Sequence, residues 1–185
     1  MDYKRKLKDY LEREVAVIQK LDIESINTVL NVLEDARFAG KKVFICGNGG
    51  SAATASHYCC DFNKGINTNQ KKKHNFECLN DNVPMMMAIA NDIGYEEIFR
   101  YPLKNKMTPD DILIGISGSG NSQNVVNAMA YAKSIGGTTI AIVGYNGGRM
   151  KKMADYHVHV VIDDMQVSED IHMILDHLMM HVLSH

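Results

Sequence analysis

Short apolar runs alternate with helix-like segments through most of this chain, and this alternation restricts its fold more than any other feature. Five runs have the length and composition of strands: residues 43–46, 76–79, 112–116, 138–143 and 157–162. Strands that alternate with helices are usually parallel and are joined by right-handed crossovers. The sequence therefore predicts an α/β fold, a three-layer sandwich with helices on both faces of a parallel five-stranded sheet.

Residues 1–40 precede the first strand and predict two helices that form an N-terminal arm. Four apolar side chains of the first helix fall at helical spacing: Leu7, Leu11, Val15 and Ile18. This face could pack on the sheet of its own chain or on a neighbouring subunit, and the pattern alone favours neither arrangement. We expect a single domain over residues 1–185, with the helical arm at 1–40 and the α/β core at 41–185.

The composition excludes several classes of partner. A formal net charge of −2 gives no reason to expect a nucleic-acid ligand. No apolar run approaches the roughly 18 residues of a membrane span, and the first 15 residues are too charged for a signal peptide. The four cysteines lack CxxC spacing, which favours free thiols in a reducing compartment. We expect a cytoplasmic protein that binds neither nucleic acid nor membrane.

Polar, glycine-rich turns follow two of the predicted strands, at residues 47–51 and 117–122. Ligands of open parallel sheets bind where such turns converge. The second turn carries three hydroxyl groups within six residues, on Ser117, Ser119 and Ser122, at the start of a helix. Glycines let backbone N–H groups approach a ligand, and a helix N-terminus favours negative charge. This turn predicts a site for a phosphate monoester; the alternative is that the serines only cap the helix.

The first turn permits a second interpretation. Its pattern Gly47-x-Gly49-x-x-Ala52 matches the dinucleotide-binding fingerprint, and Asp81 after the second strand could contact a ribose. The signal is weak by itself, and it leaves the serine-rich turn unexplained. A triphosphate site is disfavoured because the chain contains no GxxxxGK[ST] motif.

Titratable residues gather on two predicted helices. His57 and Asp61 are four residues apart, so they project from one helix face as a surface pair or as part of a site. The last helix carries further candidates: Glu169, Asp170, His172, Asp176 and His177. Periodicity does not decide between His172 and His177 as a functional histidine.

Five segments together resemble the sugar isomerase (SIS) domain family and, within it, the phosphoheptose isomerases. They are CGNGGSAATASH (46–57), AIANDIGYEEIF (88–99), DILIGISGSGNSQNVVNA (111–128), TIAIVGYNGGRM (139–150) and EDIHMILDH (169–177). The resemblance covers nearly the whole chain. It implies a homotetramer with the N-terminal helices in the interfaces and the active sites between subunits.

The resemblance also implies roles for particular residues. The sugar phosphate would be held by the serine turn: Ser117, Gly118, Ser119 and Ser122. The open-chain sugar would contact two other segments: Asn48, Gly49, Gly50, Ser51, Asn91 and Asp92. The catalytic centre, which binds zinc in some members, would be lined by His57, Asp61, Glu169 and His177. The resemblance thus selects His177 over His172.

The implied reaction is an aldose–ketose isomerisation of a phosphosugar, with sedoheptulose 7-phosphate and D-glycero-D-manno-heptose 7-phosphate interconverting through a cis-enediol. Asp61 would be the base and His177 the acid, and a zinc ion could polarise the carbonyl. The alternative is a non-catalytic member of the family, one that binds a replication initiator or senses a phosphosugar.

The chain departs from the family pattern at several of these positions. Asp61 stands where the enzymes carry glutamate, and Glu169 stands where they carry glutamine. Gly118 replaces a threonine, and Gly65 and Gln166 replace an arginine and an aspartate. A carboxylate that is one methylene shorter retreats by roughly 1 Å, which can cost about 100-fold in rate. These departures bear on the substrate more than on the fold.

Overall fold

The computed structural model describes residues 1–184, and His185, the last residue of the predicted domain, lies outside them. The strands are β1 (Val43–Gly47), β2 (Phe76–Cys78), β3 (Ile112–Ser117), β4 (Thr138–Val143) and β5 (Tyr156–His159). The α-helices are α1 (Lys4–Ile18), α2 (Ile23–Ala39), α3 (Gly50–Cys60), α4 (Val83–Asp92), α5 (Arg100–Lys106), α6 (Gln123–Ser134), α7 (Gly148–Met153) and α8 (Met165–Ser184). Shorter helical segments are η1 (Asp61–Gly65), η2 (Ile66–Asn69) and η3 (Tyr95–Glu97). In this described part of the chain, no helix is both long enough and apolar enough to cross a membrane.

The five strands form one parallel sheet in the order β2-β1-β3-β4-β5. From β1 the chain steps outward to β2 and then returns to the opposite side of β1 to form β3. The direction of winding therefore reverses between β1 and β3, and the segments that leave these two strands diverge around a crevice. This order places the glycine turn after β1 beside the serine turn after β3.

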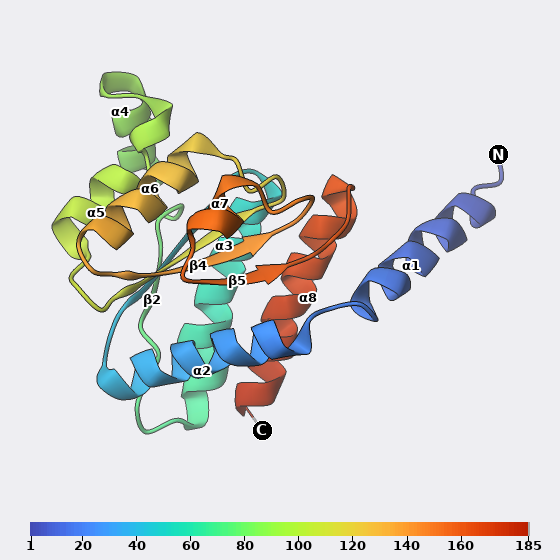
Figure 1. The fold of residues 1–185 in the computed structure, drawn as a ribbon, viewed down its shortest axis with the longest axis horizontal. Helices are drawn as coiled ribbons and strands as arrows, with labels where there is room; N and C mark the ends of the chain where they lie inside the picture. The colour runs from blue at the N-terminus through green and yellow to red at the C-terminus, as the bar shows by residue number, and fades with distance from the viewer. Residues whose placement is uncertain (185) are drawn as a thin grey trace.

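Helices cover both faces of the sheet, which confirms the predicted three-layer sandwich (Figure 1). Side chains alternate along each strand, so Ile45 and Ile114 join one core cluster and Phe44 and Leu113 join the other. The first cluster lies under α2, α3 and α8, and the second lies under α4, α5, α6 and α7. All side chains of β1 and β3 are buried, as expected for central strands of a parallel sheet.

Some element boundaries differ from the predicted ones. The helix expected at residues 51–63 ends as an α-helix at Cys60 and continues as the π-helical segment η1. The short helix α7 is absent from the sequence-based assignment because it spans only six residues and follows two glycines. The last strand, expected at residues 157–162, ends at His159.

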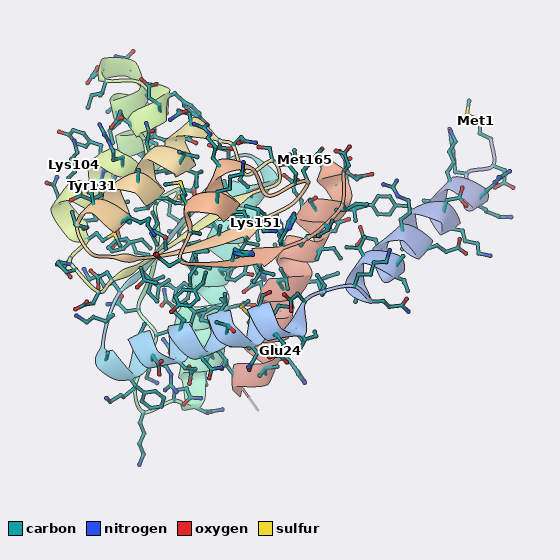
Figure 2. The ribbon with its side chains drawn as sticks, in the orientation of Figure 1. Met1, Glu24, Lys104, Tyr131, Lys151 and Met165 are labelled. Atoms are coloured by element: carbon teal, nitrogen blue, oxygen red, sulfur yellow. The ribbon has the colours of Figure 1, made fainter. Side chains whose placement is uncertain are left out.

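The predicted arm divides into two parts. The apolar residues of α2, including Val29 and Leu33, belong to the core cluster of the domain. By contrast, α1 leaves the body of the molecule, and Figure 2 places Met1 at its outer end, far from the sheet. Only Glu14 and Val17 of α1 are buried. The alternative in which α1 packs on its own sheet is therefore not the arrangement seen.

Candidate functional site

The two polar turns are joined by a network of amide groups. The side chains of Asn48 and Asn124 exchange two hydrogen bonds of 2.9 Å, and the hydroxyl of Tyr95 donates to Asn48 Oδ1 at 2.8 Å. An open cleft of about 690 Å³ lies here. Its lining comes from three segments: Asn48, Tyr95, Glu96, Ser122, Gln123 and Asn124. The fold thus positions a polar cleft where the direction of winding reverses between β1 and β3.

The serine turn is held by its own hydroxyl groups, except for that of Ser122, which makes no bond to the helix backbone in the described part of the chain. Ser117 and Ser122 place their Oγ atoms 3.1 Å apart, and the N–H of Gly120 donates to Ser117 Oγ at 3.2 Å. Ser122 is the N-cap of α6, yet within the described residues its side chain accepts no hydrogen bond from the backbone of that helix. Capping alone therefore does not explain Ser122, and an anion could bind the first turn of α6.

The glycine turn is occupied by a carboxylate. Gly49 has φ +57°, a conformation that glycine adopts without strain, and it is the N-cap of α3. The side chain of Glu169 from α8 lies against Gly50, in the space that a Cβ atom there would fill. A dinucleotide pyrophosphate would need this position at the helix N-terminus, so the arrangement disfavours the dinucleotide interpretation. Ser51 is buried directly below.

Asn91 and Asp92 lie at the end of α4 and are both exposed. The amide of Asn91 donates to Asp92 Oδ1 at 2.7 Å. Neither residue is among those that line the cleft of about 690 Å³. In this chain by itself, the structure does not bring the Asn–Asp pair to the other predicted sugar contacts.

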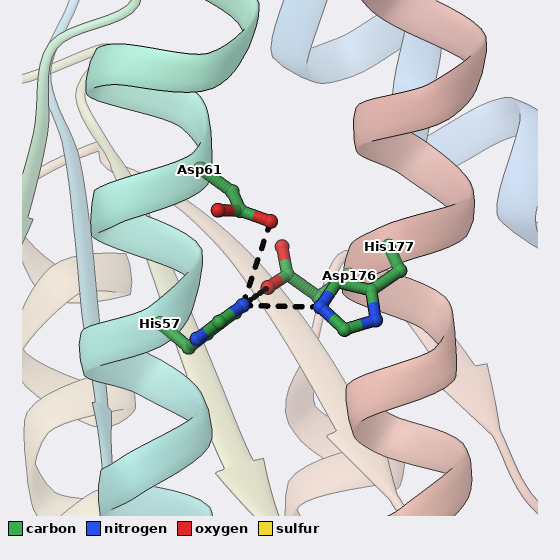
Figure 3. A group of neighbouring side chains, drawn as sticks. All are labelled: His57, Asp61, Asp176 and His177. Carbon is green, nitrogen blue, oxygen red and sulfur yellow. Dashed lines mark hydrogen bonds and ion pairs between the residues drawn. The ribbon is translucent and has the colours of Figure 1, made fainter.

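Four titratable side chains converge where α3 and its extension η1 run beside α8 (Figure 3). One potential ligand atom from each of His57, Asp61, Asp176 and His177 lies within 4.8 Å of the others. His57 Nε2 is 3.0 Å from His177 Nε2, 3.6 Å from Asp61 Oδ2 and 3.9 Å from Asp176 Oδ2. We call these four residues the His/Asp cluster.

The cluster combines exposed and buried groups. The side chain of His57 is 42% exposed and that of Asp61 is 13% exposed, whereas Asp176 is completely buried. Burial, together with the nearby carboxylate of Asp61, raises the pKa of Asp176 to about 8. Neither carboxyl oxygen of Asp176 has a hydrogen-bond partner among the described residues. An unpaired carboxyl group aimed at two imidazoles favours a bound cation at this point.

The cluster differs from the predicted metal set in one residue. His57, Asp61 and His177 belong to it, but Glu169 lies outside, about two turns back along α8 and against Gly50. Asp176 takes the fourth position. A sequence signal for it existed, because Ser168, His172 and Asp176 form a polar row at spacing four beside an apolar row of α8. That apolar row comprises Val167, Ile171, Leu175 and Met179.

The structure places the two candidate histidines in different surroundings. His177 meets His57, with ring centroids 5.1 Å apart. His172 is completely buried, and burial lowers its pKa to about 4, so its imidazole is neutral. The arrangement therefore brings His177, and not His172, to the His/Asp cluster.

Methionines pack against two of the glycines that depart from the family pattern. A Cβ atom on Gly118 would lie 2.5 Å from Met165 Sδ, and one on Gly65 would lie 2.5 Å from Met180 Cε. Larger residues at these positions would require the methionines to move. Gln166 is exposed at the start of α8.

The donor set fits a divalent metal such as zinc. Zinc in proteins is commonly held by four imidazole, thiolate or carboxylate ligands, and ligand atoms about 2.0–2.1 Å from a tetrahedral ion lie about 3.3 Å from one another. The separations of His57 Nε2 from the other three residues, 3.0, 3.6 and 3.9 Å, bracket that value, and all four ligand atoms lie within 4.8 Å of one another. The unpaired oxygens of Asp176 supply the negative charge that such an ion needs.

Comparisons with known proteins agree with these features. The model of the SIS domain family matches residues 2–144. A phosphoheptose isomerase of Helicobacter pylori is 34% identical over 172 residues, which cover 93% of this chain and 87% of that protein. A probable phosphoheptose isomerase of Thermoplasma acidophilum is 34% identical over 171 residues, with coverages of 92% and 93%. The solved structure of phosphoheptose isomerase GmhA from Neisseria gonorrhoeae superposes with a TM-score of 0.90 at 25% identity, over 98% of both chains.

Proposed function

Because the chain belongs to the SIS domain family, we propose that it is an aldose–ketose isomerase that interconverts sedoheptulose 7-phosphate and D-glycero-D-manno-heptose 7-phosphate. The observation that carries the proposal is the pairing of two sites in one chain. A hydroxyl-lined turn at a helix N-terminus suits a phosphate, and the His/Asp cluster suits proton transfer. The cluster begins at His57, seven residues and therefore about 10 Å along α3 from Gly50.

Asp61 and His177 divide the proton transfers between them. Asp61 removes a proton from C1 of the open-chain ketose, which gives a cis-enediol, and returns a proton to C2. His177 moves a proton between the oxygens on C1 and C2, so that the carbonyl changes place with the hydroxyl. The two carbons are one bond apart, and the reactive atoms of Asp61 and His177 lie within 4.8 Å of each other, so both residues can serve one substrate position.

A zinc ion bound by the His/Asp cluster would polarise the carbonyl oxygen. The two imidazoles and the nearby carboxylates support this cofactor. The serine and glycine turns would orient the sugar. Ser117, Ser119 and Ser122 would hold the phosphate, together with the backbone at Gly118.

We further propose a homotetramer in which active sites lie between subunits. The apolar face of α1 supports this assembly, since Leu7 and Leu11 are 63% and 64% exposed. The exposed Asn91 and Asp92 could reach a substrate held by a neighbouring chain. The four free cysteines support a cytoplasmic location.

To test the proposed activity, the protein is incubated with sedoheptulose 7-phosphate in D2O and the reaction is monitored by NMR. We expect the aldose to form from sedoheptulose 7-phosphate with deuterium at C2, because the proton taken by Asp61 exchanges with solvent. Asp61→Asn and His177→Ala should each lower kcat by at least about 100-fold. No turnover, with or without added Zn²⁺, contradicts the proposed activity and favours a binding or sensing role.

A matched control separates the assigned roles from damage to α3. Cys60 precedes Asp61 and is exposed, so Cys60→Ser should retain wild-type activity. If Asp61→Asn retains activity as well, the carboxylate of Asp61 is not the base.

A further inference from the structure

Asp176 is a buried acid that lies beside the other residues of the His/Asp cluster. It is completely buried, yet both of its carboxyl oxygens lack a hydrogen-bond partner among residues 1–184. The buried Asp111, by contrast, accepts hydrogen bonds from the backbone of Lys42 and from Thr108. Glu14 on α1 also lacks described partners for its carboxyl oxygens, but it lies outside the His/Asp cluster. A buried carboxyl group without a partner costs free energy, so its retention requires a compensating interaction.

The direction in which Asp176 points identifies that interaction. Its Oδ2 lies 3.9 Å from His57 Nε2, and the carboxylate faces the same space as Asp61 and His177 (Figure 3). Two imidazole Nε2 atoms are 3.0 Å apart in this space, and only one of them can donate to the other. A cation between them would satisfy both nitrogens and both carboxylates at once.

Glu169 is placed for a different contact. Its carboxylate lies against Gly50 at the N-terminus of α3, where a negative charge is favoured by the helix dipole. It is eight residues before His177, so the two are separated by about 12 Å along the axis of α8. Glu169 therefore belongs to the glycine turn, while Asp176 belongs to the His/Asp cluster.

We infer that Asp176, and not Glu169, is the fourth ligand of a divalent metal held by His57, Asp61 and His177. This inference rests on the metal of the proposed function and assigns its ligands. Asp176 is then the buried ligand of the site, and the exposed His57 and His177 lie on its solvent side, where a substrate oxygen can approach. Glu169 is free to act on the sugar end of the substrate.

The test measures binding of Zn²⁺ alone, without substrate. Equilibrium dialysis of the metal-depleted protein, with bound metal counted by mass spectrometry, should find one Zn²⁺ per chain. Asp176→Asn should weaken this binding by at least about 100-fold, since even loss of an outer partner costs 10–100-fold. The matched variant Glu169→Gln removes the same charge two turns away and should change the affinity by less than about threefold. Equal affinity in Asp176→Asn and wild type, or loss of binding in Glu169→Gln, overturns the assignment.

Thermal unfolding separates ligation from a structural role. In EDTA, Asp176→Asn and Asp176→Leu should unfold at or above the wild-type Tm, because each removes a buried unpaired carboxyl group. Excess Zn²⁺ should raise the Tm of the wild type and of Glu169→Gln but not that of the Asp176 variants. Asp176 variants that are less stable than wild type in EDTA contradict the inference. Turnover is measured separately, so active protein that binds no Zn²⁺ refutes the metal site and leaves the isomerase proposal standing.

Discussion

At the scale of single residues, burial shifts the pKa values of His172 and Asp176 in opposite directions, and both shifts have the same physical cause. The two residues are one turn apart on α8 and both are completely buried. Burial disfavours the charged form of each, so it lowers the pKa of His172 to about 4 and raises that of Asp176 to about 8. Without a cation, both groups are neutral over much of the range between these values. The same low-polarity environment that keeps the imidazole of His172 neutral also keeps Asp176 protonated, unless a cation such as the proposed metal lies beside it.

The lowered pKa of His172 predicts a pH dependence of stability. Between about pH 4 and 6.5 the unfolded chain binds a proton at His172 that the folded chain does not bind, so stability is complete above pH 6.5 and falls as the pH drops towards 4. The loss from this group should reach about 3 kcal/mol. The raised pKa of Asp176 acts in the opposite direction over the same pH range, so the contribution of His172 is read from the difference in urea unfolding, at several pH values, between the metal-depleted wild type and His172→Leu.

His172→Leu is the matched comparison for this effect. His74 also has a pKa lowered to about 4 by burial, and it is present in both proteins, so its contribution cancels in the difference. We expect a shallower dependence on pH in the variant. If the free energy of unfolding depends on pH identically in the wild type and in His172→Leu, then His172 does not control acid stability.

At the scale of elements, the turns after β1 and β3 decide what the sheet can bind. The serine turn is held against the turn before α7, since the N–H of Gly144 donates to the carbonyl of Gly118 and the N–H of Met150 donates to that of Gly120. Gly120 has φ +65°, and a Cβ atom there would collide with the backbone of Gly147. The shape of the serine turn therefore depends on an element, α7, that the sequence did not predict.

Two glycine substitutions distinguish the stability cost of a left-handed backbone conformation from the cost of a steric collision. Gly40 has φ +70° with open space around it, so Gly40→Ala should cost only the left-handed conformation, about 1–2 kcal/mol. Gly120→Ala has a similar φ and the collision with Gly147 as well, so it should cost about 1–3 kcal/mol more. Urea unfolding gives both values. Equal losses of unfolding free energy in the two variants would show that the serine turn moves to accommodate the added methyl group at no cost.

At the scale of the whole molecule, α1 is a helix whose apolar face the rest of the described chain leaves exposed. Its polar contacts with the body include the hydroxyl of Tyr10 on Asp170 of α8 and the guanidinium of Arg13 on Asp164, the residue before α8. Val17 near its end joins the core cluster. Its apolar face stays uncovered, including Leu7, Leu11 and Val15, which are all more than half exposed. A second copy that covers this face would explain why the chain keeps such a helix.

A charge placed on this face should disrupt the proposed assembly. Leu7→Glu with Leu11→Glu removes two apolar contacts of about 1.5–3 kcal/mol each and introduces like charges. We expect a smaller particle by light scattering coupled to size-exclusion chromatography. Ala16→Glu is the control, because Ala16 is exposed on the opposite side of α1 and a charge there should not change the mass. An unchanged mass in Leu7→Glu/Leu11→Glu places the interface elsewhere.

The layers, the parallel sheet and most elements could be predicted from the sequence, because hydrophobic periodicity and glycine turns are local signals. The sequence also identified His57, Asp61 and His177, the last only through a family resemblance. The tertiary structure decided which of the acids on α8 meets them. Glu169 and Asp176 share a helix face, and only the packing of α8 against α3 and η1 places one at the glycine turn and the other in the His/Asp cluster. Such a choice depends on contacts between helices more than 100 residues apart in the chain, which local periodicity does not encode.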